Sequence, residues 1–235
     1  MQAFKAQLNE IWQSFDAIAG RIRLDKPLAI QPGQYLQIWR EQDEAALPEV
    51  IFPVSLVEDD SLAVDRILPG WMPGDRLNVW GPLGKGFQLP AGVHFLTLAA
   101  PEGDPSRLMP LIQLAIERGA AVSLFLANSE NTWLLSLPLD VEVQALAELP
   151  EALTWADFLA LEASINTIQC LKHVLGLEGQ ISWLPCPGQV LVRTAMPCAG
   201  VADCGVCAVN TQHGWRQACS DGPVFPLEVL LNVVG

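Results

Sequence analysis

The chain is poor in basic residues. Its 235 residues include 13 Lys and Arg against 26 Asp and Glu, which gives a formal net charge of −13 at pH 7. Phosphates of nucleic acids are bound mainly through Lys and Arg, so this balance argues against a nucleic-acid partner. No run approaches 18 uninterrupted apolar residues, and we expect no membrane span. The opening residues lack an apolar h-region, so we expect no signal peptide and a cytoplasmic location.

Histidine is also scarce. The three histidines, His94, His173 and His213, are scattered, and no pattern pairs one of them with a nucleophile or a carboxylate. The sequence therefore gives no support to a hydrolytic enzyme. Hydrophobic residues make up 51% of the chain. This content predicts either a large core or an apolar surface that another subunit covers.

Four cysteines near the C-terminus carry the strongest chemical signal. Cys198, Cys204 and Cys207 lie within ten residues on a stretch of Ala, Gly and Val, and Cys219 follows after eleven more. The spacing Cys-x5-Cys-x2-Cys, followed by a distant Cys, is one residue from the plant-type [2Fe–2S] ferredoxin spacing. Small residues such as Gly200 leave backbone N–H groups free to point at thiolate sulfur. We interpret these four residues as cluster ligands.

Two other interpretations of the cysteines stay open. A structural zinc site usually has two Cys-x2-Cys pairs, and here there is one. Buried or bridged thiols are the other alternative, but disulfides need an oxidising compartment and nothing indicates export. Cys170 and Cys186 lie outside the group and are expected to be ordinary buried thiols, while His213 is expected in a solvated loop.

Three zones follow one another along the chain. Residues 1–90 hold short apolar runs separated by Pro-Gly turns, which predicts an antiparallel β-barrel. Residues 91–185 begin with a strand at 94–99, a helix from Pro105 with Asp104 as N-cap, and a strand at 121–127, which predicts a parallel α/β unit. A strand at 141–145 and one or two helices within 156–175 are expected to complete it. Residues 186–235 form a small cysteine segment that must dock on the rest.

One glycine-rich turn lies between the barrel and the α/β unit. Its sequence is GPLGKGF, residues 81–87. Three glycines in six residues let the backbone adopt positive φ and approach a ligand closely. A glycine-rich turn between two domains has the same composition, so this motif alone does not decide between a cofactor site and a structural turn.

Together, four motifs resemble a known family. GQYLQI (33–38), PGDRLNVWGPLGKGF (73–87), the four cysteines and CSDGPVF (219–225) resemble the electron-transfer subunit of type B dihydroorotate dehydrogenase, a ferredoxin-reductase-like protein. The resemblance implies an FAD-binding barrel, a nucleotide-domain-like α/β unit and a C-terminal [2Fe–2S] segment. It also implies a catalytic flavoprotein partner, a hetero-oligomer and a role in pyrimidine biosynthesis. The chain would then be a non-catalytic electron-transfer subunit of an oxidoreductase.

Three departures from the family pattern concern FAD and NAD. Phe52 stands where the family has the arginine that pairs with the FAD diphosphate, although Pro53, Val54 and Ser55 keep the rest of that motif. A phenyl ring offers no charged fork. A Gly-x-Gly-Thr phosphate loop is missing before the turn at 73–75, and Glu102 and Asp104 replace the glycines of the nicotinamide site. We expect no NAD binding. The FAD contacts, if retained, are expected at Pro53, Val54, Ser55, Gly84, Lys85 and Gly86, with Arg66 as a further cation.

The sequence thus predicts an electron-transfer subunit with a [2Fe–2S] cluster and with FAD as a second cofactor. The alternative is a flavin-free, cluster-bearing structural or regulatory subunit of a partner enzyme. Loss of the phosphate contacts favours the alternative, and retention of Pro53-Val54-Ser55 and of the GPLGKGF turn opposes it.

Overall fold

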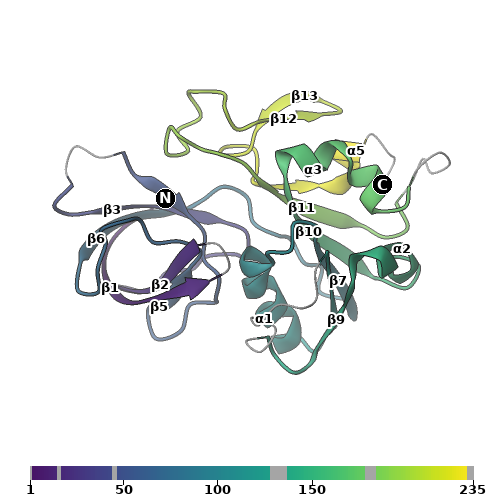
Figure 1. Cartoon of the computed structure of the whole chain (residues 1–235), viewed down its shortest axis with the longest axis horizontal. Helices are drawn as coiled ribbons and strands as arrows, with labels where there is room; N and C mark the ends of the chain where they lie inside the picture. The colour runs from purple at the N-terminus through teal and green to yellow at the C-terminus, as the bar shows by residue number, and fades with distance from the viewer. Residues whose placement is uncertain (1, 15–16, 44–46, 128–136, 178–183, 232–235) are drawn as a thin grey trace.

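The computed structural model describes residues 2–14, 17–43, 47–127, 137–177 and 184–231. Figure 1 shows a barrel on one side, a twisted sheet with helices on the other, and a cysteine-bearing lobe above both. This arrangement confirms the predicted fold class. No helix within the described ranges is long and apolar enough to cross a membrane.

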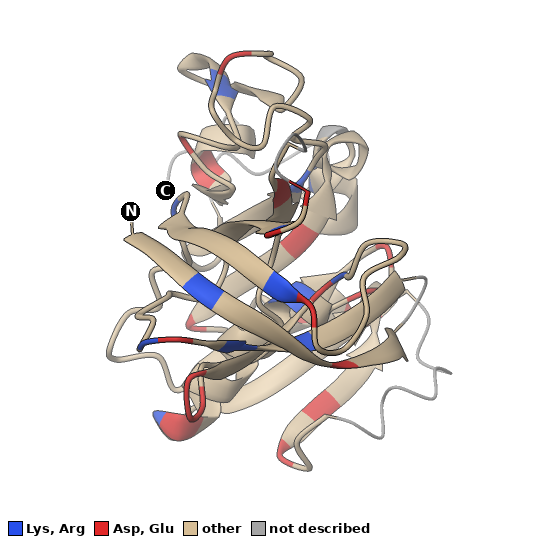
Figure 2. Cartoon of the chain, turned by 90° about the vertical axis from the view of Figure 1, so that its left-hand side faces the viewer, with Lys and Arg blue, Asp and Glu red and all other residues tan. Residues whose placement is uncertain are grey.

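The barrel is a six-stranded antiparallel sheet in the order β4-β3-β6-β1-β2-β5. Its strands are β1 (Gln2–Ser14), β2 (Ala17–Leu24), β3 (Tyr35–Arg40), β4 (Glu49–Ile51), β5 (Ser61–Val64) and β6 (Arg76–Leu83). A bridge between Pro53 and Val64 joins the two edges and closes the sheet. Alternating residues such as Phe4, Leu8 and Ile22 point inward and are buried. Charges of both signs lie on the outer face of the barrel (Figure 2).

The second sheet has the order β14-β11-β10-β7-β8-β9. Five strands are parallel: β7 (Phe95–Ala100), β8 (Ala121–Leu126), β9 (Val141–Ala145), β10 (Phe158–Ser164) and β11 (Gly188–Arg193). The edge strand β14 (Val224–Pro226) pairs antiparallel with β11. β7 lies next to both β8 and β10, so the chain reverses its direction of travel across the sheet between β7 and β10.

Short helices connect the strands. They are η1 (Ser106–Leu108), α1 (Met109–Glu117), η3 (Leu146–Glu148), α2 (Leu149–Ala152), α3 (Ile165–Gln169), α4 (Leu171–Val174) and α5 (Leu227–Leu231). The expected helix from Pro105 begins as a 3-10 turn and becomes α-helical only at Met109. Asp104 still provides a hydrogen-bond acceptor for the first turn, because its Oδ1 accepts a hydrogen bond of 2.9 Å from the Ser106 N–H.

Two expectations for these segments are corrected. The region 156–175 was expected to be helical, but residues 158–164 form strand β10, and only the short α3 and α4 follow it. Six of the seven strand residues are buried, as in a parallel strand covered on both faces. Cys170, expected to be buried, is exposed, whereas Cys186 is buried as expected.

The domain boundaries at 90/91 and 185/186 stay predictions. The second one falls inside a single sheet, because β11 and β14 of the cysteine segment pair beside β10. A hydrophobic cluster also joins the barrel to the α/β unit, with Tyr35, Phe52 and Phe87 packed together with residues of β7, α1 and β8. The three zones therefore share cores rather than standing apart.

Candidate iron–sulfur centre

The cysteine lobe is the segment of chain that connects two neighbouring strands, β11 and β14. The chain leaves the sheet at the end of β11 and returns at β14, where Leu191 faces Val224. Between them, β12 (Ala208–Thr211) and β13 (Gly214–Gln217) form a hairpin whose turn holds His213, exposed as expected. The four cysteines lie before, at the start of and after this hairpin.

The four cysteines form two pairs. The sulfur atoms of Cys207 and Cys219 are 3.4 Å apart, and both residues are buried. The Cys204 thiol is near enough to Cys198 to help lower the pKa of that residue, and this pair lies nearer the surface. A [2Fe–2S] cluster has two irons, each of which takes two protein ligands. In the described part of the chain no three His, Cys, Asp or Glu groups already converge on one point. The donor set suits a two-iron cluster, which would join the pairs.

Backbone amides surround the outer pair. Burial pulls the pKa of Cys198 upward, but N–H groups of Asp203, Cys204 and Gly200 outweigh it and lower that pKa to about 6. The left-handed backbone at Ala199, Gly200 and Ala202 produces the tight turns of this loop. A thiol that ionises readily is a ready metal ligand, because the thiolate is the form that binds.

The inner pair lies in an apolar environment. Burial, together with the adjacent Cys207 thiol, raises the pKa of Cys219 to about 11. Cys207 and Cys219 belong to the same hydrophobic cluster as residues of β10, β11 and α5. This side of the centre is therefore held against the sheet and shielded from water, while the Cys198–Cys204 side faces outward.

Barrel strand β3 holds the cysteine loop in place. The buried hydroxyl of Tyr35 donates a hydrogen bond of 3.0 Å to the carbonyl oxygen of Cys219. The buried amide of Gln37 donates to the carbonyl oxygen of Ala199. Gly200 packs on the Tyr35 ring so closely that a Cβ there would collide with the phenol. Burial, and then the three nearby cysteines Cys219, Cys207 and Cys198, raise the pKa of Tyr35, so it stays a neutral donor.

The glycine-rich turn contacts the CSDGPVF segment directly. The Lys85 N–H donates to the Gly222 carbonyl oxygen at 2.5 Å, and the Val224 N–H faces the Lys85 carbonyl oxygen at 3.4 Å. A Cβ at Gly84 would lie 2.6 Å from Cδ of Pro223. The glycine at position 84 thus serves close packing of two chain segments, which is the structural interpretation of this motif.

The residues expected to hold FAD fall into two groups. Gly84, Lys85 and Gly86 line a recess on the side of β11 and β14. Pro53, Val54 and Ser55 lie at the barrel seam instead, where the Ser55 hydroxyl accepts from the Ala63 N–H at 2.9 Å. Arg66 is bound to Glu49 and to the Val50 carbonyl oxygen. The assignment of FAD contacts stays a prediction.

A guanidinium group does lie beside Phe52, the residue that stands where the family pattern has an arginine. Arg107, from η1, stacks on the Phe52 ring with its central carbon 4.3 Å from the ring centroid. Its charge is already compensated, since it pairs with Asp65 at 2.8 Å and lies 3.7 Å from Glu162. As arranged, positions 52–55 do not offer an FAD diphosphate a free cationic fork.

Glu162 is the most deeply buried carboxyl of this group. It is 1% exposed, and neither of its oxygens has a hydrogen-bond partner among the described residues. Burial raises its pKa to about 8, against the opposing attraction of Arg107. Asp65 is also bonded to the Phe52 N–H at 2.9 Å, so this set of charges joins the barrel to the sheet.

The crevice at the reversal point of the sheet is filled by Glu102. This carboxylate accepts a hydrogen bond of 3.0 Å from the Ser164 N–H, another from the Thr167 hydroxyl, and pairs with Arg193 at 3.3 Å. In open α/β sheets, nucleotide phosphates usually bind at this position. Hydrogen bonds from Ser164 and Thr167 lower the pKa of Glu102 despite its burial, so it carries a negative charge there.

Sequence reasoning missed the residues that support the centre. Tyr35 lies in the quoted GQYLQI motif and is the only tyrosine of the chain, which was a usable signal. Gln37, in the same motif, alternates with Tyr35 on one face of β3. Arg107 carried no motif, because its role depends on a contact between η1 and the distant barrel segment at 52–65.

The fold and the centre define a class: a ferredoxin-reductase-like architecture with a C-terminal iron–sulfur lobe. Residues 194–231 match the family model described as the iron–sulfur cluster binding domain of dihydroorotate dehydrogenase B, which confirms the resemblance drawn from the motifs. A curated relative is the dihydroorotate dehydrogenase B (NAD(+)) electron transfer subunit of Desulforamulus reducens. The two are 27% identical over 180 residues, or 68% of each chain.

Solved structures of reductases share the fold. One is the NADH-dependent reduced ferredoxin–NADP oxidoreductase, with a TM-score of 0.70 and 16% identity over 95% of this chain and 88% of that chain. Another is the ferredoxin reductase of carbazole 1,9a-dioxygenase, with a TM-score of 0.60 and 18% identity over 76% and 67%. At these identities the similarity establishes the architecture alone.

Proposed function

We propose that this chain is the electron-transfer subunit of a hetero-oligomeric oxidoreductase of the dihydroorotate dehydrogenase B type. The observation that carries the proposal is the arrangement of Cys198, Cys204, Cys207 and Cys219 as two pairs inside the segment that matches that family's cluster-binding domain. A [2Fe–2S] cluster bound there supplies one-electron transfer. The chain itself would be non-catalytic and would serve pyrimidine biosynthesis through its partner.

The residues around the cysteines have distinct tasks in this proposal. Cys207 and Cys219, which are buried against the sheet, would bind the cluster on the side shielded from water. Tyr35 and Gln37 fix the loop to the barrel, and the amides of Gly200 and Asp203 stabilise negative charge on sulfur. Donors of this kind favour the reduced, more negative state of a cluster and so raise its potential.

The partner would be a catalytic flavoprotein subunit that contacts the lobe near Cys204. Three large apolar side chains on the lobe are exposed: Val201 at 65%, Val206 at 53% and Trp215 at 71%. Val201 and Val206 flank the exposed Cys204 in sequence. Exposed apolar groups beside a redox centre are typical of a surface that another subunit covers. We also propose a cytoplasmic location, where thiols stay reduced and available to iron.

A second candidate is the flavin-free, cluster-bearing subunit. The pairing of Arg107 with Asp65 favours it, because the guanidinium beside Phe52 is then not free to bind a diphosphate. The ferredoxin-reductase-like architecture favours FAD as a second carrier. The visible spectrum of anaerobically purified protein distinguishes them, since flavin adds its own bands and is released by acid for identification.

The test of the main proposal is reconstitution with a partner. The chain, purified anaerobically, is mixed with a catalytic dihydroorotate dehydrogenase subunit from the same source, and dihydroorotate is added. We expect an EPR signal of the reduced cluster that requires both the partner and dihydroorotate. A cluster that stays oxidised while the partner's own flavin is reduced would contradict the proposal.

A further inference from the structure

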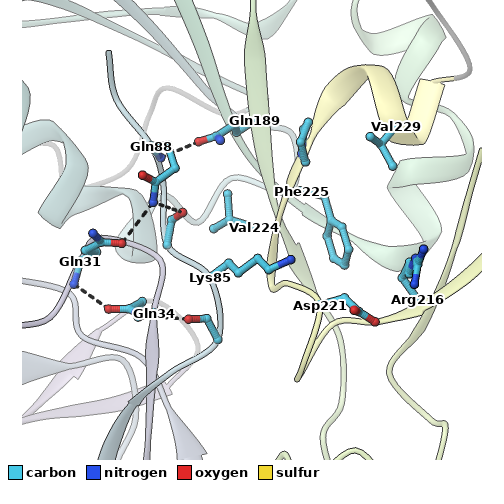
Figure 3. Close-up of a pocket in the computed structure, with 13 residues that line it drawn as sticks. Gln31, Gln34, Lys85, Gln88, Gln189, Arg216, Asp221, Val224, Phe225 and Val229 are labelled. Carbon is cyan, nitrogen blue, oxygen red and sulfur yellow. Dashed lines mark hydrogen bonds between the residues drawn. The ribbon is translucent and has the colours of Figure 1, made fainter. Parts of the chain in front are cut away.

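The recess that Gly84, Lys85 and Gly86 line lies beside the cysteine lobe, and none of the four cysteines lines it (Figure 3). Its volume is about 770 Å³, within the range of small-molecule sites. The barrel segment before β3, the GPLGKGF turn, the start of β11, the hairpin strand β13, strand β14 and helix α5 all contribute to its wall. Barrel, sheet and lobe thus meet around one cavity.

Two cations face this cavity from distant parts of the chain. Lys85 extends from the turn, and Arg216 comes from β13 on the opposite wall (Figure 3). Within the described residues neither side chain has an ion pair or a hydrogen bond. By contrast, Arg66, Arg107 and Arg193 are each paired with a carboxylate. In a chain of net charge −13, two unpaired cations around one recess make a local site for an anion.

One carboxylate shares the cavity and opposes an anion. Asp221 lies on the side of Arg216, and its Oδ2 accepts a hydrogen bond of 2.9 Å from the Gln217 N–H. It forms no ion pair with Arg216 or Lys85 among the described residues. The recess is therefore lined by two cations and one carboxylate, and that carboxylate already accepts a hydrogen bond from a backbone N–H.

The rest of the wall suits a flat ring with polar edges. Val224, Phe225 and Val229 provide an apolar side. Opposite them is a rim of glutamine amides held by hydrogen bonds. The side-chain Oε1 of Gln189 accepts a hydrogen bond from the Gln88 backbone N–H at 2.7 Å, which leaves the side-chain NH₂ of Gln189 for a ligand. An apolar wall with a few fixed polar groups is the usual composition of a site for a heterocycle.

We propose that this cavity binds a nucleotide-sized organic anion. Its planar ring lies between the apolar wall and the glutamine rim, and its phosphate or carboxylate lies between Lys85 and Arg216. The site goes beyond the electron-transfer role, because the four cysteines do not line it and the rest of the expected FAD motif, Pro53 to Ser55, lies at the barrel seam instead. Arg216 lies between the third and fourth cysteines, and the backbone of Lys85 is bonded to Gly222. A ligand here would therefore fasten the lobe to the barrel.

The test uses the full chain with its cluster and AMP as the probe. Calorimetric titration of AMP is carried out on the native protein and on Lys85→Gln and Arg216→Gln, which keep a polar side chain but remove one charge. Lys172→Gln is the matched control, because Lys172 is an exposed cation on α4 outside the cavity. Melting curves establish that each variant is folded.

We expect one AMP per chain and binding that weakens as salt is raised, since exposed charges are screened. Lys85→Gln and Arg216→Gln should each weaken binding about ten- to hundredfold, the usual effect of losing one charge-assisted contact, and Lys172→Gln should leave it unchanged. Adenosine and inorganic phosphate alone should each bind at least about tenfold more weakly than AMP.

Three results would overturn the proposal. The first is the absence of saturable AMP binding to the native, folded protein. The second is equal affinity in Lys85→Gln, Arg216→Gln and the control. The third is phosphate or adenosine binding as tightly as AMP, since the site then recognises only one half of the ligand. None of these results bears on whether the cysteines carry a cluster, which iron analysis measures separately.

Discussion

The hydroxyl of Tyr35 donates a hydrogen bond of 3.0 Å to the carbonyl oxygen of Cys219, and so ties barrel strand β3 to the fourth cysteine. The two residues are 184 positions apart in the sequence and both are buried. We expect Tyr35→Phe to lower the free energy of unfolding by roughly 1–3 kcal/mol, because it leaves a buried carbonyl unsatisfied. Urea unfolding measures this effect. The decay of cluster absorbance in air should also be faster than in the native protein, and an unchanged decay would mean that the contact does not support the centre.

Cys204→Ser tests the ligand assignment. Serine ionises less readily than cysteine and is a poorer ligand for iron. We expect the variant to lose most of its iron, acid-labile sulfide and brown colour. Cys170→Ser is the matched control, because Cys170 is exposed and lies outside the lobe. Full iron and sulfide content in Cys204→Ser would show that Cys204 is not a ligand.

Nicotinamide binding is predicted to be absent. Glu102 occupies the crevice between β7 and β10 and is held there by Ser164, Thr167 and Arg193. Its negative charge repels a pyrophosphate at the place where a helix N-terminus would otherwise attract one. Calorimetric titration with NADH at physiological concentrations, carried out with AMP present at saturation so that the recess at Lys85 and Arg216 is filled, should give no binding heat. Tight NADH binding would overturn this interpretation of the α/β unit.

Flavin retention is tested at Phe52. Because Arg107 is bound to Asp65, we expect any FAD taken up by the native protein to be lost on desalting. If flavin is a cofactor of this chain, Phe52→Arg should strengthen its binding by adding a fork of donors, and otherwise the substitution should change nothing. Absorbance after desalting measures both cases. Stoichiometric FAD that survives dialysis of the native protein would contradict the expectation of weak binding.

Glu162 predicts a dependence of stability on pH. Its pKa is about 8 in the folded chain, above the ordinary value of about 4.3 for an unfolded Glu. Between these values the folded state keeps a proton that the unfolded state has released, so the contribution of Glu162 to stability is lost as pH rises through this window. Glu162→Gln has no such titration. We expect the stability of the variant relative to the native protein to increase from pH 5 to pH 8 in urea unfolding. An equal difference at both pH values would contradict the raised pKa.

Much of the fold was predictable because it depends on local patterns. The strands at 121–126 and 141–145 are apolar or alternating runs bounded by turns, and they lie within a residue of the expected ranges. Strand β1 (Gln2–Ser14) is not among the predicted strands, because its mixture of charged and apolar residues was weighed only for a signal peptide, which it does not resemble. The sequence predicts a helix where β10 lies, because a continuous apolar run has no periodicity that separates a buried strand from a buried helix.

The residues of the site were predictable only where reactive side chains lie close together in the sequence. The four thiols lie within 22 consecutive positions, and their spacing was enough to group them. The roles of Tyr35 and Arg107 depend on contacts between the barrel and elements far along the chain. Gly84 illustrates the same limit. The glycine-rich motif around Gly84 suggested a ligand site. In the structure, the absence of a Cβ at Gly84 makes room for Pro223, and no local sequence pattern indicates this contact.

The excursion between β11 and β14 begins and ends at adjacent strands, with Leu191 facing Val224 and the Val192 N–H bonded to the Pro223 carbonyl oxygen. The sheet therefore closes the loop by itself, before any metal is present. Strand pairing already holds the two ends of the loop together, so cluster assembly does not carry the loss of conformational entropy that loop closure causes. Assembly of a cluster has to order only the residues between those ends. Loss of iron would disorder a closed loop at the edge of the molecule and leave the barrel and the five parallel strands with their own hydrogen bonds.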